Sequence, residues 1–162
     1  MQPSMMRLVL ACLAFGACAA DDDGGGSGLP DDLDVIASGP ASGTISGTPF
    51  TVGTRFMNVS GSDLYVDLLP VAAADCTLDE TDGRYPFIIF FVPPTPGRYP
   101  LGFSSRTVTF VDAPSNNLVV SDGVIEIEAI TATTVTGGLH VFNSEFGEVN
   151  GRFDGTLCFS NP

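Results

Sequence analysis

The chain has 162 residues with 19 acidic and 6 basic side chains, which gives a formal net charge of −13. An acidic surface of this kind repels phosphate backbones, so the composition excludes nucleic acid as a partner. It also disfavours direct adsorption of the folded part to anionic lipid head groups. Hydrophobic residues make up 44% of the chain, which favours a globular fold.

The N-terminus has the features of an export signal. The apolar run Leu8–Ala17 is too short to span a bilayer, and Cys18 directly follows the small pair Gly16-Ala17. This arrangement resembles the lipobox of bacterial lipoproteins, although Phe15 stands where that family usually has Leu. The resemblance implies that residues 1–17 are a signal peptide and that Cys18 is lipidated. Cys18 would then be the mature N-terminus and the membrane anchor.

An ordinary secretory signal, cleaved after Ala19, is the alternative. In the lipoprotein family, Asp directly after the lipidated cysteine tends to retain the protein at the inner membrane, so Ala19 at that place implies the outer membrane. Asp21-Asp22-Asp23 resembles acidic export tags that send some lipoproteins to the cell surface, and a solvated acidic spacer is the other interpretation. We therefore expect an exported outer membrane lipoprotein, on the periplasmic face or at the cell surface.

Residues 18–34 read as a tether. They combine the stretch Gly24-Gly25-Gly26-Ser27-Gly28 with six Asp residues and almost nothing apolar. Such a segment cannot bury enough surface to offset its ordering entropy, so it is predicted to be a flexible linker. Residues 35–162 are then of ordinary size for a single domain with its own core.

The remaining chain shows strand patterns, and no window shows apolar residues at helical spacing over ten or more positions. The expected strands lie at 45–59 (broken by Gly47 and Gly53), 64–69, 87–92, 98–103, 107–111, 118–121, 124–130, 133–142 and 149–159. Phe87–Val92 is apolar on both faces, which indicates a central strand covered on each side. Asp122-Gly123 between two apolar runs predicts a two-residue hairpin turn.

Eight to ten short strands predict an all-β fold, either an antiparallel β-sandwich or a small closed β-barrel. Gly43–Thr48 and Gly151–Thr156, at opposite ends of the domain, share the pattern G-x-[I/F]-x-G-T. Pairing of the first and last strands would close a barrel and hide both edges. The other interpretation is that Gly-Thr pairs are simply common in this chain.

Two cysteines remain in the folded domain, Cys76 and Cys158. An exported domain with two cysteines most plausibly pairs them, so we predict a structural disulfide. A reactive thiol or a metal-binding pair is the alternative, but the chain has no C-x-x-C, and His140 is its single histidine.

Few residues carry catalytic chemistry. The chain contains no G-x-S-x-G segment. On its predicted strand, His140 shares a face with Thr136 and Phe142, which predicts a half-exposed structural histidine. Glu126 and Glu128 project from one strand face about 7 Å apart. Paired carboxylates could serve glycoside hydrolysis, and the alternative is the solvated face of a strand. We expect no enzymatic activity.

Asp79, Glu80 and Asp82 form a weak Ca²⁺ candidate in the loop that carries Cys76. Leu78 stands where the first Asp of an EF-hand loop belongs, so a plain acidic loop is the alternative. We expect no cofactor.

The C-terminal segment Gly151–Cys158 follows the pattern G-x-F-x-x-x-x-C. Together with the residues from Gly123 onward, it is similar to small uncharacterised β-rich lipoproteins of myxobacteria and their relatives. The resemblance implies compartment and fold class, and no catalytic role. We expect a non-enzymatic, membrane-anchored envelope or surface lipoprotein with a binding or structural role, in contact with an envelope or surface protein. The alternative is a carrier of a small apolar ligand inside a β-barrel.

Overall fold

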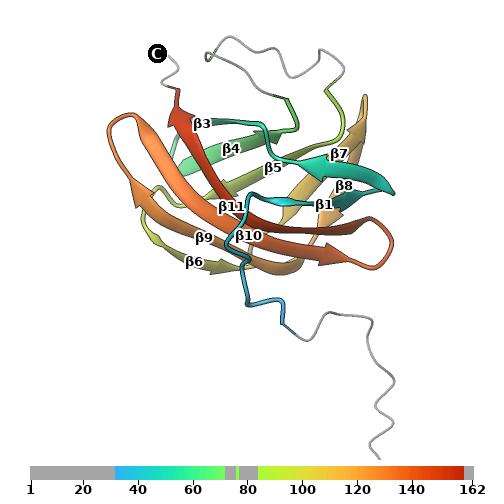
Figure 1. Cartoon of the computed structure of the whole chain (residues 1–162). Helices are drawn as coiled ribbons and strands as arrows, with labels where there is room; N and C mark the ends of the chain where they lie inside the picture. The colour runs from blue at the N-terminus through green and yellow to red at the C-terminus, as the bar shows by residue number, and fades with distance from the viewer. Residues whose placement is uncertain (1–31, 72–75, 77–83, 159–162) are drawn as a thin grey trace, which may run out of the picture.

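The computed structural model describes residues 32–71, 76 and 84–158 (Figure 1). Within these residues it contains strands and no helix, so the all-β prediction is confirmed. The strands are β1 (Ser42–Ile45), β2 (Thr48–Thr51), β3 (Thr54–Ser60), β4 (Asp63–Leu69), β5 (Phe87–Val92), β6 (Gly97–Pro100), β7 (Val108–Ala113), β8 (Asn116–Val120), β9 (Asp122–Ile130), β10 (Thr134–Asn143) and β11 (Gly147–Leu157). No helix in the described part is long and apolar enough to cross a bilayer.

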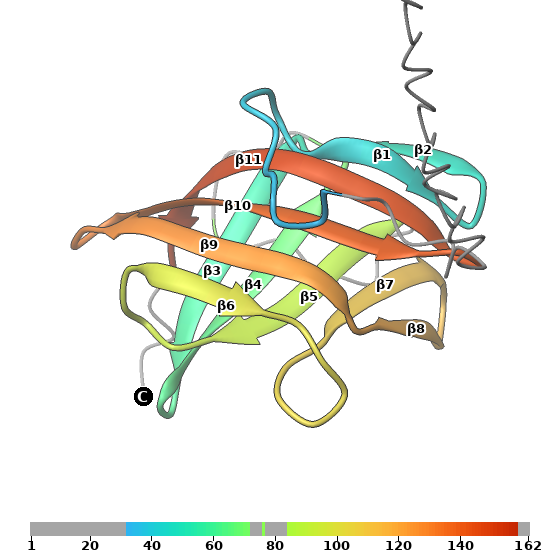
Figure 2. The same cartoon turned by 90° about the horizontal axis from the view of Figure 1, so that it is seen from below.

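The strands form two layers that pack face to face (Figures 1 and 2). One layer has the order β3-β4-β5-β7-β8, and the other has the order β6-β9-β10-β11-β1-β2. The layers are joined where β11 runs parallel to β3 over the pairs Thr156–Phe56 and Leu157–Met57. Among the described strands the sheets do not close into a ring. The architecture is therefore the sandwich, and the closed barrel is wrong.

The first and last strands do pair. β1 runs antiparallel to β11 from Ser42–Asn150 to Ile45–Gly147. On its other side β1 pairs with β2, which remains an edge strand. The pairing of β1 with β11 therefore does not close the sheet into a barrel. The chain before β1 also packs closely on β11, because a Cβ on Gly151 would lie 2.6 Å from the carbonyl oxygen of Pro40. The φ of Gly151, 142°, is likewise one that glycine adopts readily.

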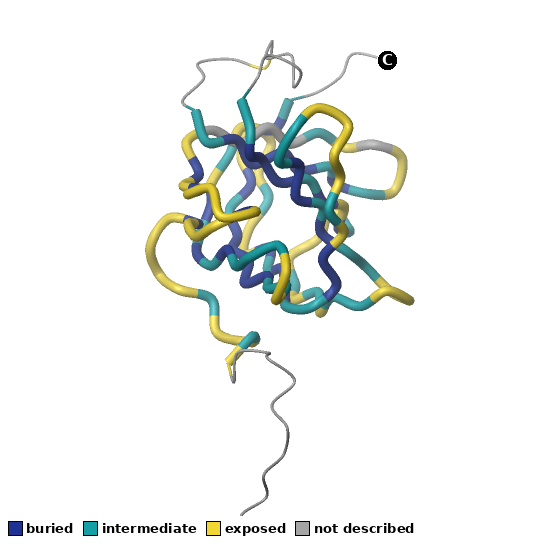
Figure 3. The backbone as a smooth tube through the Cα atoms, turned by 90° about the vertical axis from the view of Figure 1, so that its right-hand side faces the viewer, coloured by how far each residue is buried: buried dark blue, intermediate teal, exposed yellow. Residues whose placement is uncertain are grey.

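Aromatic side chains from both layers fill the space between the sheets. Phe50, Phe90, Phe110 and Phe153 are each at most 3% exposed. The rings of Phe90 on β5 and Phe153 on β11 lie 5.9 Å apart, so the two layers touch directly through the interior. Figure 3 shows the buried positions along the strands, with the exposed positions mostly in the connections between them.

β5 is a central strand, as predicted, but only one of its faces is covered along its full length. Its inward side chains, including Ile88 and Phe90, are buried. On the outward face Phe87 is buried in a small second cluster with Leu69 and Val111, whereas Phe91 is 48% exposed. The prediction of cover on both sides is wrong at this end, because an antiparallel sheet of a sandwich turns one face to solvent.

The predicted hairpin at Asp122-Gly123 is wrong. β8 pairs with β7 and β9 pairs with β6 and β10, so the chain crosses from one layer to the other between β8 and β9. Gly123 has a φ of 131°, and a Cβ there would lie 2.0 Å from the carbonyl oxygen of His140. The glycine therefore serves a close approach to β10, and the two-residue turn is absent.

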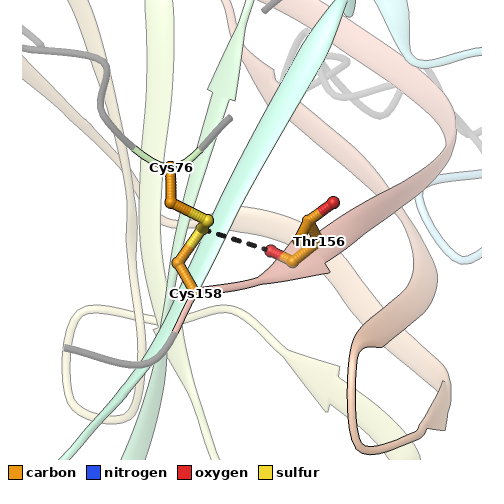
Figure 4. The surroundings of a disulfide bond; sticks show 3 residues. All are labelled: Cys76, Thr156 and Cys158. Carbon is orange, nitrogen blue, oxygen red and sulfur yellow. Dashed lines mark hydrogen bonds between the residues drawn. A yellow bond between two sulfur atoms is a disulfide. The ribbon is translucent and has the colours of Figure 1, made fainter. Parts of the chain in front are cut away.

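Cys76 and Cys158 form a disulfide, as the sequence predicts (Figure 4). Their Cα atoms are 5.8 Å apart, and 82 positions separate them in the chain. Cys158 directly follows β11, so the bond ties the end of the last strand to the middle of the chain. A persistent disulfide indicates an oxidising, exported environment.

Candidate functional site

Three charged side chains lie on the outer face of the β9–β11 layer. Nη1 of Arg152 on β11 donates to Oε2 of Glu126 at 2.5 Å and to Oε1 of Glu128 at 2.8 Å. Both carboxylates stand on β9, and β10 runs between the two strands. Gly138 of β10 pairs with both Glu126 and Arg152, and its lack of a side chain leaves the arginine room to reach across.

Glu126 and Glu128 share one face, as predicted, but they do not form an open pair. One arginine nitrogen bonds both carboxylates, and the three side chains are 23 to 47% exposed. Each ion pair at this exposure contributes at most about 1 kcal/mol. A glycosidase pair needs a substrate bond between its carboxyl groups, and the guanidinium stands there instead. The arrangement is that of a cross-strand clamp.

Replacing Gly138 with Ala is expected to lower the free energy of unfolding by about 1–3 kcal/mol through overpacking. The new Cβ would lie 2.9 Å from Cδ of Arg152 and 2.7 Å from Cγ2 of Ile36. Thermal unfolding measures the loss, with Gly39→Ala as control because a Cβ on Gly39 meets nothing within 4 Å. In an Arg152→Ala background the cost of Gly138→Ala should shrink. Equal stability of the Gly138 and Gly39 variants would contradict the crowding.

His140 lies on the same face and is only 4% exposed, so the predicted half-exposure is wrong. Its Nε2 lies 2.9 Å from Oε1 of Glu148, and its Nδ1 is buried without a hydrogen-bond partner among the described residues. The chain segment before β1 is held on the neighbouring residue Asn150. Asn150, the cross-strand neighbour of His140, accepts a hydrogen bond from the backbone N of Ala37 and donates one to the carbonyl of Val35.

This segment, residues 34–40, crosses the outer face of β10 and β11. The carbonyl of Asp34 accepts a hydrogen bond from Arg98 on β6, and Gly39 accepts one from the backbone of Arg152 at 2.7 Å. Beside it lies an open hollow of about 340 Å³. Its polar lining comes from Ser38, Glu128, Thr136, Arg152 and Asp154. Two carboxylates already bond the arginine, and Asp154 adds a further acidic side chain to the lining. The hollow therefore carries more negative than positive charge.

A second hollow, of about 270 Å³, lies on the outer face of the other layer. Asp63, Phe91, Ser105, Arg106 and Thr107 line it. The ring of Tyr65 on β4 packs at 4.9 Å against that of Phe91, because these residues are cross-strand partners. Sequence reasoning missed this site, since the two aromatic residues are far apart in the chain. The signal available was the position of Phe91 in a strand with an apolar outward face.

Two predicted sites lie outside the described residues: the lipidation site Cys18, and the Ca²⁺ candidate formed by Asp79, Glu80 and Asp82. In the part of the chain that is described, no group of three or more His, Cys, Asp or Glu side chains could hold a metal ion.

Over the described residues, the fold and these sites define a disulfide-bonded, all-β sandwich domain, and the hollows described above lie on its outer faces. Comparisons of the chain with protein-family models, with curated proteins and with solved structures find no match.

Proposed function

We propose that this protein is an exported, non-enzymatic binding module of the cell envelope, held on the outer membrane by a lipid on Cys18. The disulfide supports an oxidising compartment, and the lipobox resemblance supports the anchor. Two or more acyl chains, which such lipoproteins carry, give stable attachment where one gives only marginal attachment.

The ring contact between the two layers is the observation that carries the binding role. Phe90 and Phe153 meet between the layers and are nearly fully buried. A carrier of a small apolar ligand would need that space for its cargo. Where Phe90 and Phe153 meet, side chains occupy the interior, which favours contacts with other molecules on the outer faces and loops. An envelope or surface component is therefore the expected partner.

Replacing Cys18 with Ser is expected to move the protein from the membrane fraction to the soluble fraction. The reason is that the lipid would be attached to the Cys18 thiol, and serine has no thiol to carry it. Fractionation of cells that express the full chain, followed by immunoblotting, measures the change. Cys12→Ser is the matched control, because Cys12 lies within the apolar run of the signal. A Cys18→Ser protein that still sediments with membranes would show that the anchor is assigned wrongly.

A further inference from the structure

The second hollow has an aromatic floor that solvent can reach. Phe91, at the end of β5, is 48% exposed although it stands on a central strand. Tyr65 supports it from β4 with its ring tilted by 54° and its centroid 4.9 Å away. Two packed rings hold each other in place, so the floor is a rigid apolar surface that can accept a flat apolar face of a ligand.

Arg106 stands at the rim in a fixed position. Its Nε donates to the carbonyl of Phe91 at 3.0 Å, and its guanidinium lies 5.1 Å from the centroid of the Tyr99 ring. The loop that carries it connects β6 to β7 (Figure 2) and is closed by two backbone hydrogen bonds between Gly102 and Arg106. Among the described residues its two terminal nitrogens make no hydrogen bond or ion pair. They are therefore preorganised donors.

The rest of the rim offers the complementary groups. Asp63, at the start of β4, can only accept hydrogen bonds when ionised, whereas Arg106 can only donate them. The hydroxyls of Ser105 and Thr107 can do both. One small hollow thus combines an apolar floor with donors, acceptors and hydroxyls around its edge.

This combination selects against most ligand classes. The overall charge of −13 disfavours phosphate and other anions. Within the hollow, Asp63 and Arg106 carry opposite charges, so the lining itself favours neither a cation nor an anion. A wholly apolar ligand would strip water from Arg106 and Asp63 without replacing their hydrogen bonds. The ligand that fits has an apolar face and an uncharged edge of groups that both donate and accept. A pyranose ring has this character, with C–H groups on its face and hydroxyls on its edge.

We propose that the hollow formed by Asp63, Phe91, Ser105, Arg106 and Thr107 binds one or two rings of a neutral saccharide. The volume of about 270 Å³ lies just below the range of roughly 300–1,000 Å³ typical of sites for drug-sized ligands. The site therefore suits a short part of a longer glycan. This assignment rests on the proposed binding function, and it names the class of ligand for it.

Affinity electrophoresis of the full, exported chain tests the proposal. Native gels contain a neutral polysaccharide (hydroxyethylcellulose, xyloglucan, glucomannan, dextran or soluble starch) or an anionic one (alginate or polygalacturonate). Protein that fractionates with membranes is extracted in a detergent without a sugar head group. We expect at least one neutral polysaccharide to retard the protein. Phe91→Ala should raise the dissociation constant at least tenfold, because the stacking surface is lost.

Two further variants guard against a folding defect. Asp63→Asn keeps the size of the side chain and removes only its charge. Arg106→Gln shortens the side chain and removes the whole guanidinium, including the Nε that bonds the carbonyl of Phe91. Each should also weaken retention about tenfold. Val119→Ala is the matched control, since Val119 is 43% exposed on the same layer and lies outside the hollow. This variant should bind like the native chain.

Retention by none of the neutral gels, retention by the anionic gels alone, or retention that survives Phe91→Ala would each overturn the saccharide site. These outcomes are separate from the anchor test. A chain that binds a neutral glycan but still sediments with membranes after Cys18→Ser would contradict the anchor and leave the site standing. A chain that needs Cys18 to stay on membranes but is not retarded by any neutral gel would support the anchor and contradict the saccharide site.

Discussion

Replacing Cys76 with Ser is expected to lower the free energy of unfolding by about 4–5 kcal/mol. The bond between Cys76 and Cys158 closes a loop of 82 positions, and the entropy that such a cross-link removes from the unfolded chain has this magnitude. At about 4 °C per kcal/mol for a domain of this size, the melting temperature should fall by roughly 15–20 °C. Differential scanning calorimetry under non-reducing conditions measures the shift.

The control is the partner cysteine. Cys158→Ser and the double variant should both have the melting temperature of Cys76→Ser, because all three lack the same single bond. Cys76 is exposed, so a reductant should bring the native chain to the same temperature and leave the variants unchanged. Coincident melting of native and Cys76→Ser protein would contradict a stabilising bond.

The strands were predictable because their signal is local. Alternation or dense β-branched and aromatic residues marked β4, β5, β9, β10 and β11 within a few residues of their bounds. The partner of each strand was not predictable in the same way. Asp122-Gly123 has the composition of a hairpin turn, but the turn would have held β8 and β9 in one layer. The two strands instead belong to different sheets, and each buries its inward side chains from its own layer. The burial of these side chains outweighs the local preference for a turn.

The candidate sites also differ in whether local sequence or strand pairing determines them. The disulfide followed from counting cysteines, which needs no geometry beyond an exported chain. The clamp between Arg152 and the two glutamates depends on the register of three strands and on the missing side chain of Gly138. The contact of Tyr65 with Phe91 likewise depends on the pairing of β4 with β5. A single sequence does not specify such register, so only the outward direction of Glu126 and Glu128 could be foreseen.

Replacing Phe90 with Ala is expected to lower the free energy of unfolding by about 3–5 kcal/mol. Phe90 is 1% exposed and its ring meets that of Phe153 between the layers. Its removal deletes buried contacts from both sheets and leaves a cavity that the packed surroundings refill only in part. Chemical denaturation with urea measures the loss, and an unchanged slope would show that the unfolded state is the same.

The neighbouring residue supplies the matched control. Phe91→Ala removes the same side chain from the outer face, where it is half exposed, and should cost only about 1 kcal/mol. The Phe90→Ala cavity should also bind a small apolar probe such as benzene, as apolar cavities of this kind do, whereas the native chain should not. If Phe90→Ala and Phe91→Ala cost the same, and the native chain already takes up benzene, the interior holds free space. That result would favour the carrier over the surface-binding module, because an aromatic ring that borders a lumen has few contacts to lose.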